Sequence, residues 1–503
     1  MKKIKIAAIA ALASLCAVSC QGFLETNPTS SVSDNQVFTS IQGANAALNG
    51  CYNLLHFSAG SRADLNGYIS QICTFDATGE DLIVYGGWYG YDYNFWGHQR
   101  GDIFKSQGLW WYYYVLINNL NSVIYYTPKI ESASEAEINN IVGQALAMRG
   151  WSYFMLAQLF QHTYQLSHPR NMPGVPIYTE PTTDQTEGKP RGTIDDTFNQ
   201  ILDDLTKAET MLSGYSRTAK NHVDQSVAQG ILARVYLVMQ DWSKAAEYAA
   251  KARAKYPLTT NEQWNAGFND ISTPSWMWGL MQDEENQLTA NGDYGPFALW
   301  ANWVTRNGGD FWSFNCFYLP DAFVNLFEEN DIRRQQMWFK ADAGYGLYCS
   351  NKFYQLTDGK KLVPAGFPYM RSDEMLLIEA EAKAHMPGSE AEAQAIVGQL
   401  QAMRGETPTI KTGDSLVEDI LLERRKELYG EGFAWLDIIR NCKPIVREGN
   451  HDQYSGAVKI PAKSWRFVYQ IPNNEILNNP NINSDPWPAG DQNVFDAITV
   501  TLE

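Results

Sequence analysis

The chain has 503 residues, of which 45% are hydrophobic and 19% are charged, and its formal net charge is −17. A chain of this length and composition is globular and can bury a sizeable core. The negative charge argues against a nucleic-acid-binding protein, because a phosphate backbone requires a basic contact surface.

The N-terminus is predicted to be a targeting segment rather than part of the fold. Residues 1–5 are basic, and the apolar run 6–18 is too short to span a bilayer. The small residues before Cys20 resemble those of a bacterial lipoprotein signal, which predicts removal of 1–19 and acylation of Cys20. The alternative is ordinary secretion with an unmodified Cys20. No other apolar run reaches transmembrane length, so lipid at Cys20 would be the only membrane attachment.

Helical periodicity predicts four helices in the first half of the chain, at 34–55, 109–126, 134–161 and 193–212. Ser134 and Glu137 have the spacing of a capping box at the start of the third helix. Thr193 is the expected N-cap of the fourth helix.

Two further amphipathic helices are predicted within 227–257, joined by a tight turn at Gln240 and Asp241. Small and apolar residues of this segment occupy the positions of a tetratricopeptide repeat, namely Leu232, Ala233, Tyr236, Ala245, Ala252 and Pro257. The alternative is an ordinary helical hairpin. Because one repeat cannot bury its apolar face alone, other helices should stack on this pair.

The segment 58–100 loses helical periodicity and contains an aromatic, glycine-rich loop at 86–98. Flat rings can pack on the apolar faces of sugars, and polar side chains can bond their hydroxyls. We therefore expect ligand contacts here from Trp88, Tyr89, Tyr91, Asp92, Tyr93, Asn94 and Trp96. The alternative is that these rings form a satellite core. Asp64 and Asn66, in the polar loop before, could also bond a sugar or simply cap the loop.

A second long segment without helical periodicity, 261–367, is rich in Trp, Gly and Asn. Loops of this length inside a compact protein are usually functional. The candidate ligand contacts are Trp300, Trp303 and Trp312. The spacing of Trp300 and Trp303 also suits one face of a short core helix.

Helices are predicted again at 371–385, 389–404 and 415–439, followed by a loop-rich tail at 441–503. The charge run 423–427 is expected to form helical ion pairs beneath the tail rather than a ligand site. Arg371 is likewise expected to be structural.

Catalytic motifs are few: there is no His-Glu-x-x-His, Gly-x-Ser-x-Gly or Gly-Lys-Ser phosphate loop. We expect no metal, no cofactor and no catalysis. A glycosidase needs only two opposed carboxylates, and the acidic run 283–285 is a candidate for them, although a solvated loop is favoured. The five Cys after Cys20 are scattered, which predicts buried thiols rather than a disulfide framework.

Several blocks, taken in order, resemble the SusD/RagB outer-membrane lipoproteins of Bacteroidetes. They are Cys20 with Phe23-Leu24-Glu25 and Pro28, residues 149–160 followed by Gly174-Val175-Pro176, residues 331–334, 371–382 and 423–440, and Ile471-Pro472 with Glu475-Ile476 and Asn479-Pro480.

This resemblance implies a mainly α fold, in which tetratricopeptide-like helical pairs support a loop-rich ligand-binding half. It implies one domain over 20–503, with inserted ligand-binding segments at about 58–100 and 261–367. In the starch-binding member of the family, aromatics and an Asn from the first segment and further aromatics from the second line the site. The family also implies a glycan or other nutrient as ligand and a SusC-like TonB-dependent transporter as partner. The chain would then be lipid-anchored in the outer membrane, facing the cell surface.

Three functions from different classes follow from these patterns. The first is a lipoprotein that captures a glycan and delivers it to the transporter. The second is a surface glycan hydrolase with paired carboxylates, which product release would reveal. The third is a structural lid of the transporter, in which the aromatics are core and no glycan is bound.

Overall fold

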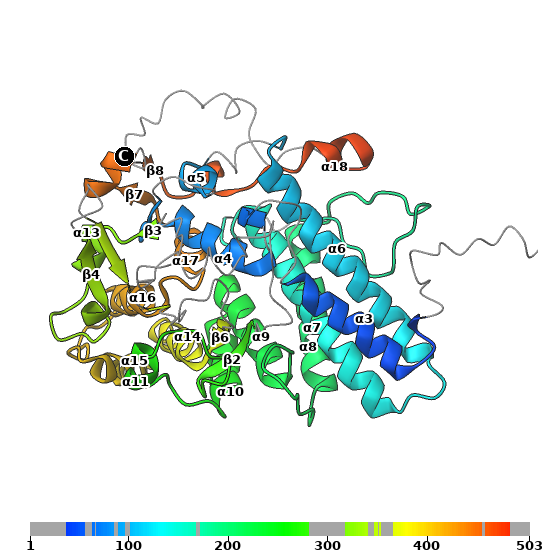
Figure 1. Ribbon diagram of the computed structural model, residues 1–503, viewed down its shortest axis with the longest axis horizontal. Helices are drawn as coiled ribbons and strands as arrows, with labels where there is room; N and C mark the ends of the chain where they lie inside the picture. Colours follow the sequence, from blue (N-terminus) through cyan, green and yellow to red (C-terminus); the bar gives the residue numbers. More distant parts are fainter. Residues whose placement is uncertain are drawn as a thin grey trace, which may run out of the picture.

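The computed structural model describes residues 37–55, 63–65, 67–84, 89–95, 101–166, 172–280, 317–340, 347–350, 352–353, 366–454 and 458–482. Within these residues the fold is mainly helical, as the sequence predicts, with short strands between the helices (Figure 1). No described helix is both long enough and apolar enough to cross a membrane. The predicted boundary between the signal segment 1–19 and the domain that begins at Cys20 lies outside the described residues and stays a prediction.

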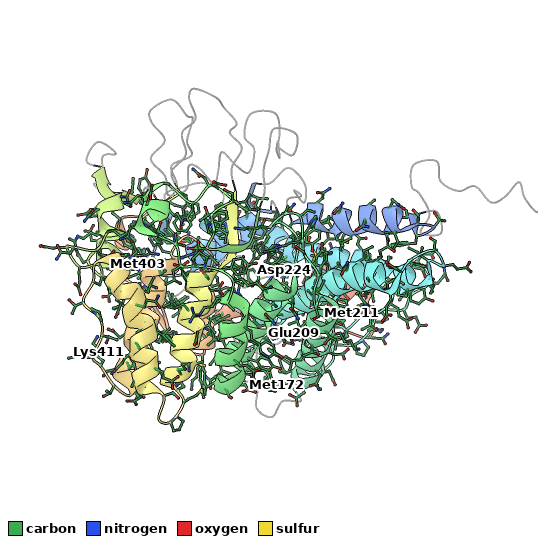
Figure 2. The ribbon with its side chains drawn as sticks, turned by 90° about the horizontal axis from the view of Figure 1, so that it is seen from below. Met172, Glu209, Met211, Asp224, Met403 and Lys411 are labelled. Carbon is green, nitrogen blue, oxygen red and sulfur yellow. The ribbon has the colours of Figure 1, made fainter. Side chains whose placement is uncertain are left out.

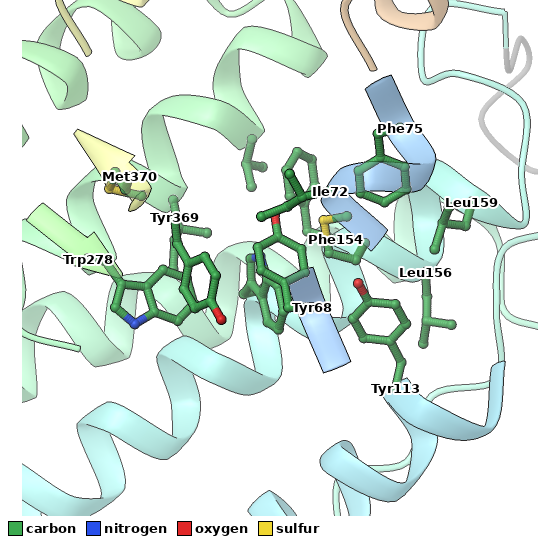
Figure 3. Packing of buried hydrophobic residues seen from close by; sticks show 14 of the residues in the cluster. Tyr68, Ile72, Phe75, Tyr113, Phe154, Leu156, Leu159, Trp278, Tyr369 and Met370 are labelled. Atoms are coloured by element: carbon green, nitrogen blue, oxygen red, sulfur yellow. The ribbon is translucent and has the colours of Figure 1, made fainter. Parts of the chain in front are cut away.

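The first helices form one wall of the molecule. They are α3 (Ile41–Leu54), α4 (Gly67–Thr78), α6 (Phe104–Tyr126) and α7 (Glu135–Leu159). The predicted capping box of α7 is confirmed, since Ser134 Oγ accepts from Glu137 N and Glu137 accepts from Ser134 N. From Ile141 to Leu159 every residue of α7 is buried, so this helix runs through the core. Figure 3 shows Phe154 of α7 beside Tyr68 and Ile72 of α4, and Leu156 of α7 beside Tyr113 of α6.

The next helices form the predicted stack of antiparallel pairs. They are α8 (Ile194–Met211), α9 (Gln225–Met239), α10 (Trp242–Arg253), α14 (Ser372–Ala384), α15 (Glu390–Arg404) and α16 (Asp414–Leu428). Gln240 adopts a left-handed conformation at the predicted turn, and Asp241 caps α10. Tyr236 stacks on Tyr248 across the pair, with 5.5 Å between ring centroids. Helix α10 packs on α14, and α14 packs on α15, so other helices do cover the pair (Figure 2).

The strands join segments that are far apart in the sequence. Four antiparallel pairs are described: β1 (Ile83–Val84) with β3 (Phe317–Tyr318), β2 (Trp276–Leu280) with β6 (Phe367–Arg371), β4 (Met337–Lys340) with β5 (Leu347–Ser350), and β7 (Ile445–Arg447) with β8 (Val458–Ile460). The pair β2 and β6 fixes both ends of the long insertion beside the helical core. Figure 3 shows Trp278 of β2 and Tyr369 of β6 in that core.

The remaining described elements are short. They are α5 (Gly90–Tyr93), α11 (Asn261–Asn265), α13 (Asp321–Val324), α17 (Ala434–Arg440), α18 (Asn473–Asn478) and the 3-10 helices Ala63–Leu65, Thr127–Lys129, Arg334–Gln336, Gly449–Tyr454 and Trp465–Phe467.

Two predicted boundaries are wrong. The segment 58–100 contains α4, whose residues are all buried and therefore lack amphipathic periodicity. The predicted helix 415–439 is two helices, α16 and α17, because Gly430 and Gly432 adopt positive φ angles of 80° and 86° between them. A side chain at Gly432 would also meet the Cα of Ile72 at 3.0 Å, so the turn lets α17 pack against α4.

The charge run 423–427 is a buried network rather than a set of surface pairs. Glu427 accepts hydrogen bonds from Arg333, Arg371 and Arg404, all of which have fully buried side chains. Arg333 comes from the insertion, Arg371 from the end of β6 and Arg404 from the end of α15, so the network connects the insertion to the helical stack. The structural role predicted for Arg371 is confirmed. The run is also structural, but its partners lie mainly on other segments rather than three or four residues away on the same helix, as was expected.

The described cysteines form no disulfide. Cys51 and Cys73 are buried, Cys349 and Cys442 are partly buried, and all four are thiols rather than members of a disulfide. This agrees with the predicted thiols for four of the five cysteines; Cys316 lies outside the described residues.

Candidate functional site

The two segments predicted to bind ligand are brought together in the fold. Strand β1 leads into the aromatic loop, and β3 lies within the second segment. The two strands pair through Ile83 with Tyr318 and Val84 with Phe317. The ring of Tyr89 lies 5.2 Å from that of Phe317, centroid to centroid. Two stretches more than two hundred residues apart in the sequence are therefore packed together close to α5.

A buried ion pair fixes helix α5 against helix α6. The Nζ of Lys105 lies 3.1 Å from Oδ2 of Asp92, and both side chains are fully buried. Asp92 also accepts hydrogen bonds from Thr74 and Tyr469, at 3.3 and 3.2 Å. Burial raises the pKa of Asp92, and the Lys105 charge opposes that rise. Asp92 therefore anchors the loop to α4 and α6.

Tyr93 forms the second anchor of the loop. Its hydroxyl lies 2.7 Å from Nδ1 of His451, and the guanidinium of Arg447 lies 4.3 Å from its ring centroid. Burial lowers the pKa of His451 to about 4, so the imidazole is neutral at neutral pH. Arg447 also donates to the carbonyls of Ala77, Thr78 and Gly79 at the end of α4.

These contacts correct part of the predicted ligand set. Tyr89, Asp92, Tyr93 and Asp64 are at most 2% exposed, so their side chains lack the free surface that sugar contact needs. They support the loop from inside, because a glycine-rich segment needs internal contacts to hold one conformation. Lys105, which holds Asp92, was missed; its position among aromatic residues on α6 gives no periodic signal.

The described residues of the predicted set that reach solvent are Tyr91 and Asn94. Tyr91 is 40% exposed, and its ring meets the ring of Phe104 edge to face at 5.3 Å. Asn94 is partly buried and donates to the carbonyl of Gly90, which closes the turn of α5. The other predicted residues lie outside the described residues: Trp88, Trp96, Asn66, Trp300, Trp303, Trp312 and the lipidation site Cys20.

Among the described acidic groups near this surface, Asp76 is a structural carboxylate. Burial raises the pKa of Asp76 to about 7, but its side chain is 1% exposed and accepts from the backbone N–H groups of Gly432 and Ala434. Asp76 therefore holds the turn before α17 and cannot protonate a bound sugar. Among the residues that the structure describes, no cluster of three or more His, Cys, Asp or Glu could hold a metal ion.

Two protein-family models match the chain, one in its first half and one in its second half. Residues 231–487, more than half of the chain, match the model described as the SusD family. The chain belongs to the SusD family. Residues 76–237 match a further model, SusD-like and described as starch-binding and associating with the outer membrane. The family predicted from the sequence is confirmed.

Relatives of this SusD family member cover most of its length. A SusD-like protein of Formosa agariphila is 25% identical, over 85% of this chain and 89% of its own. A SusD-like carbohydrate-binding protein of Bacteroides vulgatus has a solved structure that is 29% identical, with a TM-score of 0.78 over 88% of this chain and 97% of its own. A SusD superfamily structure from Bacteroides thetaiotaomicron is 25% identical, with a TM-score of 0.74 over 89% of this chain and 100% of its own. The mainly α fold is therefore shared with these proteins.

Proposed function

We propose that the chain is a non-catalytic, cell-surface lipoprotein that captures a glycan and delivers it to a TonB-dependent outer-membrane transporter. The observation that carries this proposal is the pairing of β1 with β3, which joins the two aromatic segments at α5. Membership of the SusD family and the carbohydrate-binding description of the Bacteroides vulgatus relative support it.

The chemistry of this surface suits recognition of a neutral polymer. The exposed ring of Tyr91 offers a face for a sugar, and Trp88, Trp96, Trp300, Trp303 and Trp312 are proposed to add further faces. Binding by stacking and hydroxyl contacts requires no perturbed pKa. Several weak contacts along one polymer would raise its overall affinity.

Attachment to the outer membrane is proposed through lipid at Cys20, with a SusC-like transporter as partner. The description of the family model as associating with the outer membrane supports this placement. Mass spectrometry of the membrane-extracted protein should find acyl chains on Cys20, and Cys20→Ala should release the protein from the membrane fraction. An unmodified Cys20 in a secreted protein would contradict the anchor.

Calorimetric titration of the protein beginning after Cys20, against a panel of neutral and acidic polysaccharides, tests the binding proposal. Binding to one polymer should be lost in Trp88→Ala or Trp312→Ala with the fold intact by circular dichroism. Release of shorter sugars from the bound polymer would indicate a hydrolase instead. A folded protein that binds no polymer but still binds the transporter would be a structural lid.

A further inference from the structure

A second concave surface lies beside the N-terminal part of α6, on the face of this helix that is turned away from the helical core. A groove of about 880 Å³ runs between α6, the connection at 176–186 and α18. Figure 1 shows α18 and this connection on the same side of α6. A volume of this size is at the upper end of the range for small-molecule sites, about 300–1,000 Å³. Neither the predicted ligand residues nor the surface at α5 accounts for the groove.

One wall of the groove is aromatic and rigid. Trp111 is 45% exposed, although large rings normally lie in the core. Its neighbour Trp110 is held by a hydrogen bond from Nε1 to Oε2 of Glu475, at 3.2 Å. Tyr114 donates to the carbonyl of Pro176 at 2.8 Å, and its ring lies 4.7 Å from that of Trp110. The rings of Trp110 and Tyr114 are therefore held in place without a ligand, which lowers the entropy cost of binding one.

The rest of the lining combines apolar side chains, among them Leu65, Val115 and Ile117, with polar ones and is almost uncharged. It contributes amide side chains from Gln107, Asn118, Asn119, Asn474 and Asn478, and hydroxyls from Thr182, Thr183 and Thr186. Glu475 is the one charged residue among the lining residues, in a chain with a net charge of −17. An anionic ligand would find no cation there, and a cationic ligand would find one carboxylate that is already hydrogen-bonded to Trp110. The lining therefore suits a neutral ligand with many hydroxyl groups.

Asn118 shows how the polar wall is oriented. Its Oδ1 accepts from the backbone N and the hydroxyl of Thr182, at 2.8 and 2.9 Å. These two bonds fix the side chain and leave its Nδ2 as a donor for a ligand, with no acceptor for it within the described part of the chain. Both an aromatic face and a fixed amide donor are thus built into the same groove, which is the combination that sugar recognition uses.

The groove is long enough for more than one sugar. Lining residues recur three and four apart on one face of α6, at Phe104, Gln107, Trp111, Tyr114 and Asn118. At a rise of 1.5 Å per residue this row extends over about 20 Å. Its first ring, Phe104, contacts Tyr91 of α5, so the row begins beside the surface proposed above.

We propose that this groove is a second carbohydrate-binding site, which takes a neutral oligosaccharide with Trp111 as its stacking platform. Trp110 and Tyr114 line the same wall, and Asn118 donates to a sugar hydroxyl. The inference rests on the lining of the groove and does not require that the surface at α5 binds a glycan.

The test observes the Trp111 side chain directly by ¹⁹F NMR. In protein labelled with 5-fluorotryptophan, the ¹⁹F resonance that is absent from Trp111→Phe belongs to Trp111. Malto-, cello-, xylo- and fructo-oligosaccharides are titrated in turn into the wild type and into Tyr91→Ala, which weakens the surface at α5. We expect one of these probes to shift the Trp111 resonance in both proteins. Trp111→Ala should weaken that binding event about tenfold in Tyr91→Ala protein.

Tyr125→Ala is the matched control, because Tyr125 is 44% exposed on the same helix and does not line the groove. It should leave the affinity unchanged. An unmoved Trp111 resonance with all four probes would overturn the inference, and polysaccharide binding measured on the same protein would then show that the function proposed for α5 still holds. Equal losses in Trp111→Ala and Tyr125→Ala would overturn it as well, since they would indicate a change in α6 as a whole.

Discussion

Two buried carboxylates of this protein differ in the number of cations that contact them. Glu427, near the end of α16, is contacted by three arginines. Asp92, in α5, has the single cation Lys105. Burial alone raises the pKa of both carboxyl groups, but Arg404, Arg371 and Arg333 outweigh it at Glu427 and hold that pKa well below its usual value. At Asp92 burial prevails and the pKa is raised.

This difference in the number of cations distinguishes the helical scaffold, which contains Glu427, from the candidate site, which contains Asp92. The helical stack is held by a network in which each buried charge has several partners, so removal of one member leaves others unpaired. The end at α5 is held by fewer contacts, between a short helix and the long helices behind it. A region with fewer fixed contacts can present rings to solvent, and Tyr91 does so.

The largest effect is expected from Glu427→Ala. It leaves Arg333, Arg371 and Arg404 without their shared acceptor, and breaking a buried ion pair costs about 3–5 kcal/mol. Urea unfolding should show this loss of free energy. Glu418→Ala is the control on the same helix, since its exposed pair with Lys443 should contribute at most about 1 kcal/mol. Similar losses in both variants would refute the special role of the network.

The next largest effect is expected from Asp92→Asn. It removes the countercharge of the buried Lys105, for a cost of about 3 kcal/mol in unfolding free energy. Any weaker glycan binding should accompany this loss of stability. Asn94→Ala, in the same turn, should destabilise by less than about 1 kcal/mol. If Asp92→Asn kept full stability and lost binding, Asp92 would be a ligand contact as first predicted from the sequence.

Acid should weaken the network in a defined direction. The folded pKa of Glu427 lies below its unfolded value of about 4.5, so its contribution is complete above that pH and is lost as the pH falls further. Each proton taken up on unfolding changes the free energy by about 1.4 kcal/mol per pH unit. Urea unfolding at several pH values between 4.5 and 3 gives the unfolding free energy as a function of pH. That free energy should change less steeply with pH in Glu427→Gln than in the wild type. Identical slopes would mean that other carboxyl groups control acid unfolding.

The smallest effect on stability, with an effect on binding, is expected from Tyr91→Ala. The exposed ring should contribute less than about 0.5 kcal/mol to unfolding free energy. Its loss should weaken glycan affinity about tenfold, which corresponds to about 1.4 kcal/mol. Calorimetry with the polymer found in the panel measures this change. Unaltered affinity would place the ligand on the other aromatic residues of the two segments or in the groove along α6.

The sequence by itself determined most of the helices and several of their ends, because these depend on contacts three and four residues apart; the buried helix α4 and the break between α16 and α17 are the exceptions. The capping box at Ser134 and Glu137, the cap at Thr193 and the turn at Gln240 were all predicted, and all are present. The order of blocks along the chain also identified the family, which the family model confirms.

The tertiary structure decided which charged and aromatic residues are internal. Tyr89, Tyr91 and Tyr93 look equivalent in the sequence, yet Tyr91 alone of the three reaches solvent. The reason is that Lys105, Tyr469 and His451, which hold the loop, come from other parts of the chain. The same holds for the groove, whose walls come from α6, the connection at 176–186 and α18. Contacts between segments so far apart leave no periodic signal, so only the folded chain brings them together.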